Sequence, residues 1–483
     1  MKQKLFKTLR ILFFGLVVLV TLAALWIAEE SFRGKRAWEN HKREAEARGE
    51  KFALAAFVPP PVPDDENFAM TPLLKPLFGP DTGYGTRLGE TLKIHGTPAN
   101  SPAPVLVGMW KAQRVDLKGW GVYLGDPDIL GALEKYDTEL SEISEASRRR
   151  FSRFPIPYEE GFAARLPHIT ALMGLQRLYT LRALAALSQG DADRAFADEQ
   201  TLNRLALSVS DEPLLISQLV RLSILSLHCQ VIWEGLAAHQ WSDTQLTAMQ
   251  GDLSRLDLLK DVRRALESER AAAADYWPKV VRNPGLLQQM TLMGPAPETA
   301  RSSFMLQCTA ALLRARAWQN LLVLSQFYER YLRAGVDPSA HRVLMEPLKA
   351  AEAEMQRLAG TYSLDTPLAR LTIPAITPSI SKFASSQTTV DEALIACGLE
   401  RYRLAHGGYP ETLEALVPQY LAKLPHDVIT GEPLHYRRTT DGLFLLYSVG
   451  WNERDDGGVP GVKDKGRQDI QQGDWVWRYP SAQ

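Results

Sequence analysis

Apolar residues run without interruption near the amino terminus of the chain. The stretch from Ile11 to Ala28 carries no charged side chain, and the ten residues before it hold four cations. These cations are Lys2, Lys4, Lys7 and Arg10. As a helix the stretch is about 27 Å long, which is enough to cross most of the hydrocarbon layer of a bilayer. The pattern therefore predicts that residues 1–28 form a cytoplasmic tip and a transmembrane anchor.

The cations also predict an orientation, because positive residues beside a span stay in the cytoplasm. We expect residues 1–10 in the cytoplasm and the bulk of the chain in the periplasm, with the anchor in a bacterial inner membrane. A cleaved signal peptide is the alternative, and cleavage needs small residues one and three positions before the cut. A cut after Ala28 places Trp26 at the outer position, and a cut after Ala24 places Leu22 there. A retained single-pass anchor is therefore the preferred prediction.

Two segments of different composition follow the anchor. Residues 29–63 are rich in Lys, Arg and Glu and end in four prolines within five residues, Pro59 to Pro63. We expect a charged helical stalk and then an extended spacer, because consecutive prolines forbid helix. Residues 64–128 are dense in glycine and proline, and no apolar period persists in them. They are expected to form an irregular segment of loops, short strands and helical turns.

Apolar residues at helical spacing dominate residues 129–370, which predicts a helical domain. Within it, residues 183–207 form a helical hairpin around Gly190 that is similar to one unit of a tetratricopeptide array. No fixed period continues from this hairpin. We therefore expect an irregular helical bundle or a short solenoid.

Several residues in this region have the pattern of helix starts. Asp191 is placed to cap a helix, and Ser242 with Gln245 three positions later makes a capping-box pattern. Asp337 followed by Pro338 fits an N-cap with a proline in the first turn. These positions predict where individual helices begin.

The chain changes character after residue 370. Residues 371–387 contain prolines and serines and are expected to form a hinge, and residues 388–483 are expected to form a separate head. The head begins with a predicted helix over Val390 to Leu404, whose wide apolar face is typical of a helix that lies on a sheet. Gly407 and Gly408 are expected to end this helix.

Short strands are predicted after that helix. Leu434 to Tyr436 and Leu443 to Val449 alternate in the manner of a hairpin across an Asp-Gly turn. Trp475 and Trp477, with Val476 between them, would add a further strand with both indoles on one face. The whole chain is therefore predicted to be an α+β protein that is predominantly α-helical.

Composition and charge exclude several functions. The 55 basic and 56 acidic side chains give a formal net charge of -1, so no basic field for nucleic acid is indicated. Three widely spaced cysteines suggest neither a disulfide framework nor a zinc site. The sequence contains no Walker loop, no His-Glu-x-x-His helix and no Gly-x-Ser-x-Gly elbow. We therefore nominate no catalytic residue and expect a protein that is not an enzyme.

Three motifs near the carboxyl terminus carry a family resemblance. They are Leu399-Glu-Arg-Tyr-Arg-Leu-Ala-His-Gly-Gly-Tyr-Pro410, Leu443-Phe-Leu-Leu-Tyr-Ser-Val-Gly450 and Asp455-Asp-Gly-Gly458. In these motifs the head resembles the globular head of the major pseudopilin of type II secretion. In that family the head sits on a long amino-terminal helix, whereas here the whole helical region separates the anchor from the head. The resemblance implies a pseudopilin-like module that is displayed by an anchored helical protein.

The pseudopilin resemblance also implies calcium, because a loop near the carboxyl end of that head binds the ion. The matching loop here contains Asp455, Asp456 and Asp469 as preferred side-chain ligands and Asn452 as a weaker one. Calcium takes six to eight oxygen ligands, and glycines let the chain turn its carbonyls toward the ion. Asp-Asp-Gly-Gly is also an ordinary tight turn, and the basic residues of the same loop can neutralise its acids without a metal.

Three functions are compatible with these features. The leading hypothesis is a membrane-anchored periplasmic scaffold with protein partners in the cell envelope, associated with a type II secretion or pilus-like machine. The first alternative is an envelope hydrolase or ligand-binding protein with its site in the helical domain. The second is a calcium-stabilised structural module without a link to secretion.

Overall fold

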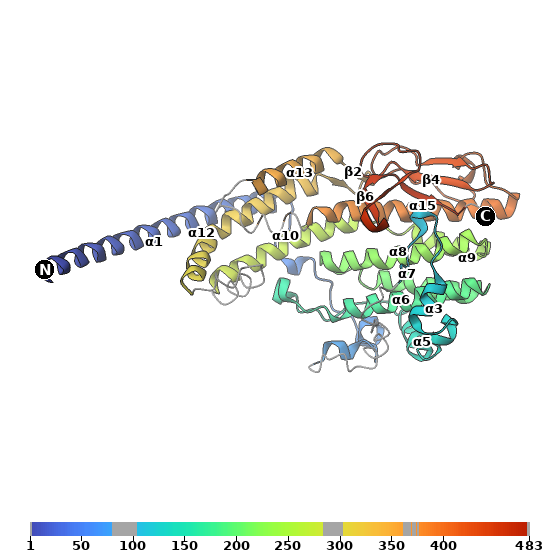
Figure 1. The fold of residues 1–483 in the computed structure, drawn as a ribbon, viewed down its shortest axis with the longest axis horizontal. Helices are drawn as coiled ribbons and strands as arrows, with labels where there is room; N and C mark the ends of the chain where they lie inside the picture. Colours follow the sequence, from blue (N-terminus) through green and yellow to red (C-terminus); the bar gives the residue numbers. More distant parts are fainter. Residues whose placement is uncertain are drawn as a thin grey trace.

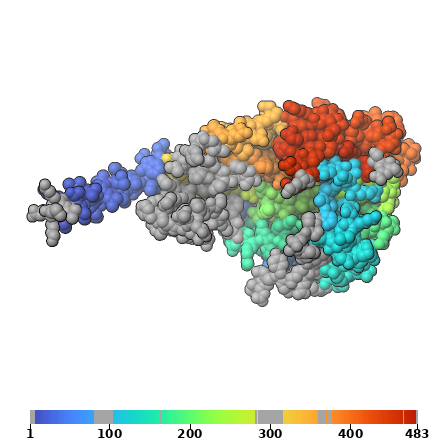
Figure 2. Space-filling view, viewed as in Figure 1, coloured from blue at the N-terminus to red at the C-terminus, as the bar shows by residue number. Residues whose placement is uncertain are grey.

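A computed structural model describes residues 2–79, 104–283, 303–360, 369, 373 and 376–480. The molecule is elongated, with one long helix that projects from a body of packed helices and a smaller β-containing part (Figure 1). Figure 2 shows the same projecting helix at one end of the surface. The fold is mostly helical with small antiparallel sheets, as predicted from the sequence. The helices of eight or more residues are α1 Lys2–Ala47, α3 Leu117–Leu124, α5 Asp137–Ala146, α6 Pro167–Ser188, α7 Ala192–Leu207, α8 Leu215–Ala237, α9 Asp243–Leu253, α10 Leu258–Arg282, α12 Ser303–Phe327, α13 Met345–Gly360 and α15 Pro378–His406.

The projecting element is α1, which joins the predicted anchor and the predicted stalk in one continuous helix of 46 residues. From Phe6 onward it is long and apolar enough to cross a membrane, and its most apolar window is entirely uncovered by the rest of the protein. Helix α8 is also apolar and long enough, but most of it is buried in the body. Helix α1 is therefore the candidate membrane span, and α8 is a core helix.

The second half of α1 packs along α12. The side-chain amide of Gln319 donates to the carbonyl of Glu30 at 2.9 Å, and His41 shares a hydrogen bond of 3.0 Å with Ser325. Gly34 lies so close to Gln319 that a Cβ atom would come within 2.5 Å of its Oε1. The stalk is therefore part of the folded body and not a free spacer.

Glu50 holds the segment directly after α1 against the body of the protein. Its buried carboxylate pairs with Arg270 of α10, and with Arg333 of the short helix η9 (Tyr328–Arg333) at 2.8 Å. Burial raises the pKa of Glu50, but the hydrogen bonds and charges of the arginines outweigh burial and hold it below the ordinary value. The guanidinium of Arg270 also lies 4.3 Å from the ring centroid of Phe52.

Helices α6 to α10 form the central bundle, in which α6 packs on α7 and α8, and α8 packs on α7 and α10. Two predicted helix starts are confirmed. Asp191 accepts a hydrogen bond from the backbone N–H of Arg194 at 3.1 Å. Ser242 and Gln245 form the full capping box, with the side chain of each bonded to the backbone of the other.

The predicted helix start at Asp337 and Pro338 is wrong. Asp337 does accept hydrogen bonds from the backbone N–H groups of Ser339 and Ala340, as an N-cap would. The chain then turns back, and β1 (Val336–Asp337) pairs antiparallel with β2 (Arg342–Val343). The same side-chain chemistry therefore closes a tight hairpin turn, because Asp favours turns as well as caps. The next helix in the chain, α13, begins at Met345.

Helix α15 is the element that joins the bundle to the carboxyl-terminal part. It contacts α8, α9 and α10 as well as the strands β4, β6 and β7. It begins at Pro378, so much of the segment expected as a hinge is helical, and it ends at Gly407, which has the left-handed φ of 80° expected of a glycine stop. The expected boundary between residues 387 and 388 therefore falls inside one helix.

The sheet beside α15 has the order β3-β4-β7 and is antiparallel throughout. Its strands are β3 His435–Arg438, β4 Phe444–Ser448 and β7 Trp475–Arg478, and a second hairpin is formed by β5 Pro460–Val462 and β6 Gln468–Gly473. The predicted hairpin and the predicted Trp-x-Trp strand are confirmed: Leu446 pairs with Trp477 and Ser448 with Trp475. Both indoles are buried.

The irregular character expected for residues 64–128 is seen where the structure describes them. Three short 3-10 helices occupy 64–78, and a fourth, η6 (Met109–Lys111), precedes α3. Residues 80–103 lie outside the described part of the chain.

Candidate functional site

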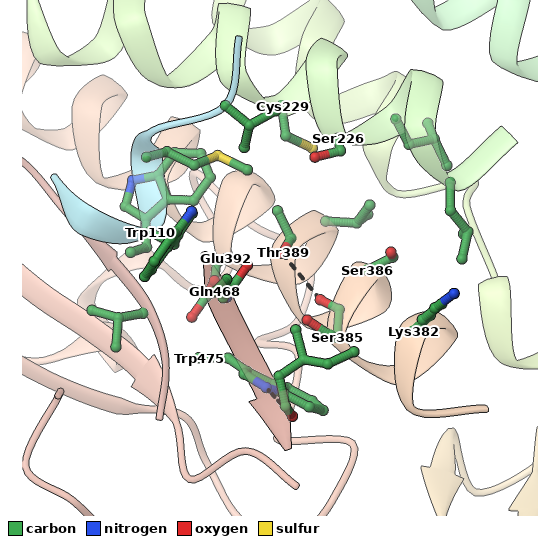
Figure 3. A pocket seen from close by; sticks show the side chains of 18 of the residues that line it. Trp110, Ser226, Cys229, Lys382, Ser385, Ser386, Thr389, Glu392, Gln468 and Trp475 are labelled. Carbon is green, nitrogen blue, oxygen red and sulfur yellow. Dashed lines mark hydrogen bonds between the residues drawn. The ribbon is translucent and has the colours of Figure 1, made fainter. Parts of the chain in front are cut away.

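A cavity of about 280 Å³ lies where the bundle meets the carboxyl-terminal part (Figure 3). Its walls come from α8, from α15, from η6 and from strands β6 and β7. These elements are distant in the sequence, from Val107 to Trp477, and only the folded chain brings them together. The volume is close to the lower end of the range for small-molecule sites.

Most of the cavity wall is apolar. Three indole rings contribute, those of Trp110, Trp475 and Trp477. Leu222 and Leu225 of α8 line the same space. Such a wall is typical of ligand cavities, in which a few polar groups fix the orientation of an apolar molecule.

Polar side chains of α8 hold η6 and the following residues in place. The Gln230 side-chain oxygen accepts hydrogen bonds from the backbone N–H groups of Gly108 and Met109, at 2.9 and 3.0 Å. The carboxylate of Glu234 accepts from the N–H of Val115 at 2.8 Å. The wall that contains Trp110 is therefore fixed by a glutamine and a glutamate, both buried.

Helix α15 supplies the polar face of the cavity. Lys382, Ser385, Ser386, Thr389 and Glu392 recur at intervals of three and four residues, which places them on one side of the helix. The hydroxyl of Thr389 donates to the carbonyl of Ser385 at 3.0 Å. Lys382 is exposed and Ser385 and Ser386 are half-buried, whereas Glu392 is buried, so the cavity leads from an open mouth to an acid.

Glu392 is the one acidic side chain in the cavity wall. It is 2 % exposed, and its Oε1 atom has no hydrogen-bond partner. Burial raises the pKa of this carboxyl well above its ordinary value, and the nearby acids Asp427 and Asp391 raise it further. Burial and the two neighbouring acids therefore favour the protonated form of Glu392.

The two neighbouring acids are engaged with other groups. Asp427 accepts from the backbone N–H groups of Ile429 and Val449, at 2.8 and 3.1 Å. Asp391 accepts from the amide of Gln387 at 3.0 Å and also faces His341. Glu392 differs from both, because neither a backbone amide nor a basic side chain satisfies it.

A second buried pair lies deeper in the bundle and is structural. His228 shares a hydrogen bond of 2.6 Å with Glu199, and both side chains are fully buried. Burial lowers the pKa of His228, but the Glu199 carboxylate outweighs burial and raises it to about 10. His228 is therefore a hydrogen-bonded histidine of the core.

In the acidic loop that is predicted to bind calcium, each acidic side chain contacts a different partner. Asp455 accepts from the Tyr447 hydroxyl at 3.0 Å, Asp456 accepts from the Asn452 amide at 2.9 Å, and Asp469 pairs with Lys463 at 3.4 Å. Among the residues that the structure describes, no group of three or more His, Cys, Asp or Glu side chains is arranged to hold a metal. Calcium in this loop stays a prediction.

Asp474 closes this loop, although it is not among the residues predicted as calcium ligands. It is buried, and its two carboxylate oxygens accept from the backbone N–H groups of Asp456 and Gly458, at 3.1 and 2.6 Å. Gly458 has a φ of +83° and packs against Leu445, so a side chain at this position would be strained.

Glu392 was also missed, although the sequence contains a signal for it. The predicted helix has an apolar stripe through Ile395 and Leu399, and Glu392 lies in line with that stripe, three and seven positions earlier. An acid in line with a buried stripe is a candidate for a special role, since unpaired acids are seldom fully buried. Periodicity alone could not show that a cavity faces it.

No family model, curated protein or solved structure matches this chain.

Proposed function

We propose that this protein is a single-pass scaffold of the bacterial inner membrane, with its body in the periplasm and with protein partners in the cell envelope. Helix α1 carries the proposal: its first half is apolar and uncovered, and its second half is packed into the body. Such a helix attaches a folded domain firmly to a bilayer. The positive residues before the span support the periplasmic orientation.

The carboxyl-terminal part supports a role beside a type II secretion or pilus-like machine. A helix that lies on a small antiparallel sheet is the arrangement implied by the pseudopilin resemblance, and α15 with β3, β4 and β7 provides it. The apolar side chains Val459 and Val462, at the β5 edge, are 59 % and 57 % exposed and offer a surface for a partner.

The proposal is tested by photo-cross-linking in native membranes. A photoreactive amino acid replaces Val459 or Val462 in the full chain, and adducts are identified by mass spectrometry. The matched control places the same residue at Ile216, an exposed apolar position on α8 that is 49 % exposed. Adducts with pseudopilins or secretion-platform proteins from the β5 positions alone support the proposal, and recovery of only the protein itself refutes the link to secretion.

The two alternatives stay predictions. An envelope hydrolase would need a nucleophile or water-activating group at its site, and the calcium-stabilised module would need an ion in the acidic loop. The cavity beside Glu392 favours the ligand-binding form of the first alternative, and its ligand is the subject of the next proposal.

A further inference from the structure

We infer that the cavity between α8 and α15 binds a small molecule with an apolar, ring-containing body and one ammonium group, which pairs with Glu392. This inference is independent of the scaffold role, because it concerns a site within one chain. It rests on three features of the cavity: an unpartnered buried acid, an aromatic wall and a half-open mouth.

The unpartnered acid indicates that a group is absent from the wall. Buried polar atoms in proteins are nearly always hydrogen-bonded, and a buried acid without a partner is costly. Oε1 of Glu392 lacks a partner although the side chain is only 2 % exposed. Because Glu392 also lines the cavity, a ligand in the cavity can supply the missing bond (Figure 3).

The charges around Glu392 favour a cation. The groups that act on this carboxyl are Asp427 of the carboxyl-terminal part, Asp391 on the same helix and the Cys229 thiol of α8. The two carboxyl groups make the site more favourable for positive charge and less favourable for a second negative charge. The one lysine of the wall, Lys382, lies nearly three turns of α15 away at the exposed mouth.

The remaining wall selects the body of the ligand. Indole faces attract ammonium groups and also pack against flat apolar rings. Trp110 comes from η6, whereas Trp475 and Trp477 both come from β7, so the fold brings two distant segments together to form the aromatic wall. The hydroxyls of Ser385 and Ser386 lie toward the mouth, where a ligand can keep contact with water.

Binding of an ammonium ion couples to one proton. Burial raises the pKa of Glu392, and an ammonium partner lowers it again, so formation of the ion pair releases a proton wherever the free carboxyl still holds one. Affinity therefore rises with pH until Glu392 is ionised in the free protein, and it falls again above the pKa of the ligand amine. A neutral ligand that accepts a hydrogen bond from the protonated acid would show the opposite dependence.

The test compares phenethylamine with 2-phenylethanol, which has the same ring and a neutral hydroxyl in place of the ammonium group. Calorimetric titration uses the full chain in detergent micelles, with empty micelles as the blank, at pH 7 in two buffers of different ionisation enthalpy. We expect the amine to bind at least about tenfold more tightly than the alcohol, since a charge-assisted pair contributes roughly 1.5–3 kcal/mol. The buffer comparison should show release of protons when the amine binds and none when the alcohol binds.

Three variants complete the test. Glu392→Gln keeps the shape of the side chain and is expected to abolish both the preference for the amine and the proton release. Ser386→Phe fills the cavity away from Glu392 and is expected to abolish binding of both compounds. Glu432→Gln, at an exposed position, is the matched control and should bind as the unsubstituted chain does. The melting temperature of each variant verifies that it is folded.

Two results overturn the inference. Equal or tighter binding of the alcohol means that the protonated acid serves a neutral ligand. Binding of neither compound by the folded, unsubstituted chain means that the cavity does not accept an arylalkyl amine.

Discussion

The indole N–H of Trp233 in α8 donates a hydrogen bond to the main-chain carbonyl of Arg478, 3.1 Å away in β7. Trp233 is fully buried in the core that the bundle shares with the carboxyl-terminal sheet. A second bond of 2.8 Å, from the Gln471 amide to the Ser381 hydroxyl, joins β6 to α15. Helix α15 therefore has the bundle on one side and the sheet on the other, and the two parts stabilise each other.

This relationship predicts that the bundle and the sheet unfold together. Trp233→Phe removes one hydrogen bond and part of a buried ring, and should lower the free energy of unfolding by about 1–3 kcal/mol. Urea unfolding, followed by circular dichroism for helices and by hydrogen exchange of the strands, should give one midpoint that shifts for both. The control is Trp451→Phe, at a half-buried position, which should change the free energy of unfolding by less than about 0.5 kcal/mol. Separate midpoints would contradict the shared core.

Glu50 is predicted to hold the end of the anchor helix on the body. Glu50→Gln leaves the buried guanidinium of Arg270 without its charge partner, and the loss should be about 3–5 kcal/mol. The folded pKa of Glu50 is lowered, so its contribution is present above the ordinary value of 4.5 and is lost as pH falls through the folded pKa.

The measurement for Glu50 is limited proteolysis of the full chain in micelles, read as the rate of cleavage between residues 47 and 60. Glu46→Gln is the matched control, because Glu46 pairs with Lys42 at the surface and is 46 % exposed. Cleavage that is no faster in the Glu50 variant than in the control would refute the role of this carboxylate.

The pair of His228 and Glu199 predicts a stabilisation that is lost as pH rises, which is opposite to the pH dependence predicted for Glu50. The folded pKa of His228 is raised from 6.5 to about 10, so the stabilisation is complete below pH 6.5 and is lost as pH rises toward 10. The stability difference between the unsubstituted chain and His228→Gln should shrink by about 3 kcal/mol between pH 6.5 and 9.

Urea unfolding at a series of pH values measures this difference. His406→Gln is the control, because His406 is exposed and stacks on Tyr402 at the end of α15. A constant difference across the pH range would show that His228 is not held in its charged form.

The anchor prediction concerns the first half of α1. Leu16→Arg combined with Leu19→Arg should cost about 5–7 kcal/mol of insertion free energy, since each arginine near the centre of a span costs about 2.5–3.5 kcal/mol. Membrane fractions washed with alkaline carbonate should retain the unsubstituted chain and lose the double variant. Intact mass measurement of the membrane-bound protein separates the alternatives: a mass that includes residues 1–28 supports a retained anchor, and a shorter chain supports a cleaved signal peptide.

Asp474 is predicted to stabilise the conformation of the acidic loop through its hydrogen bonds to the backbone. Asp474→Asn keeps one acceptor for the two backbone N–H groups of Asp456 and Gly458, and should lower stability by about 1–3 kcal/mol. Asp464→Asn, at an exposed position, is the control and should have little effect. The calcium prediction requires a separate effect: a calcium chelator should lower the melting temperature of the unsubstituted chain, and added calcium should restore it. An unchanged melting temperature would refute calcium in the loop.

Local features of this fold could be predicted from the sequence where one short segment determines the outcome. The capping box at Ser242 and the strand of Trp475 and Trp477 depend on neighbours within a few residues. Asp337 shows the limit of such reasoning, because its side chain can cap a helix or close a turn with the same hydrogen bonds. The antiparallel pairing of β1 with β2 shows that it closes a turn here.

The candidate site could not be predicted, because its wall is assembled from distant segments. The sequence shows Glu392 in line with an apolar stripe, but it does not show that Trp110 lies across from that helix. The packing of α1 on α12 was missed for a similar reason: a charged stalk is typical of a solvated helix, and only tertiary contacts such as that of Gln319 with Glu30 show the covered side.

The continuity of α1 has a mechanical consequence. A helix of 46 residues is about 69 Å long, and in the proposed anchored state it is held by lipid at one end and by the body at the other. With no break between these two regions, α1 acts as a lever, and a change in its tilt swings the whole body through the same angle. A mismatch between the span and the thickness of the bilayer is one cause of tilt in a spanning helix. In the proposed anchored state, a change in that tilt therefore turns the direction in which the mouth of the cavity faces.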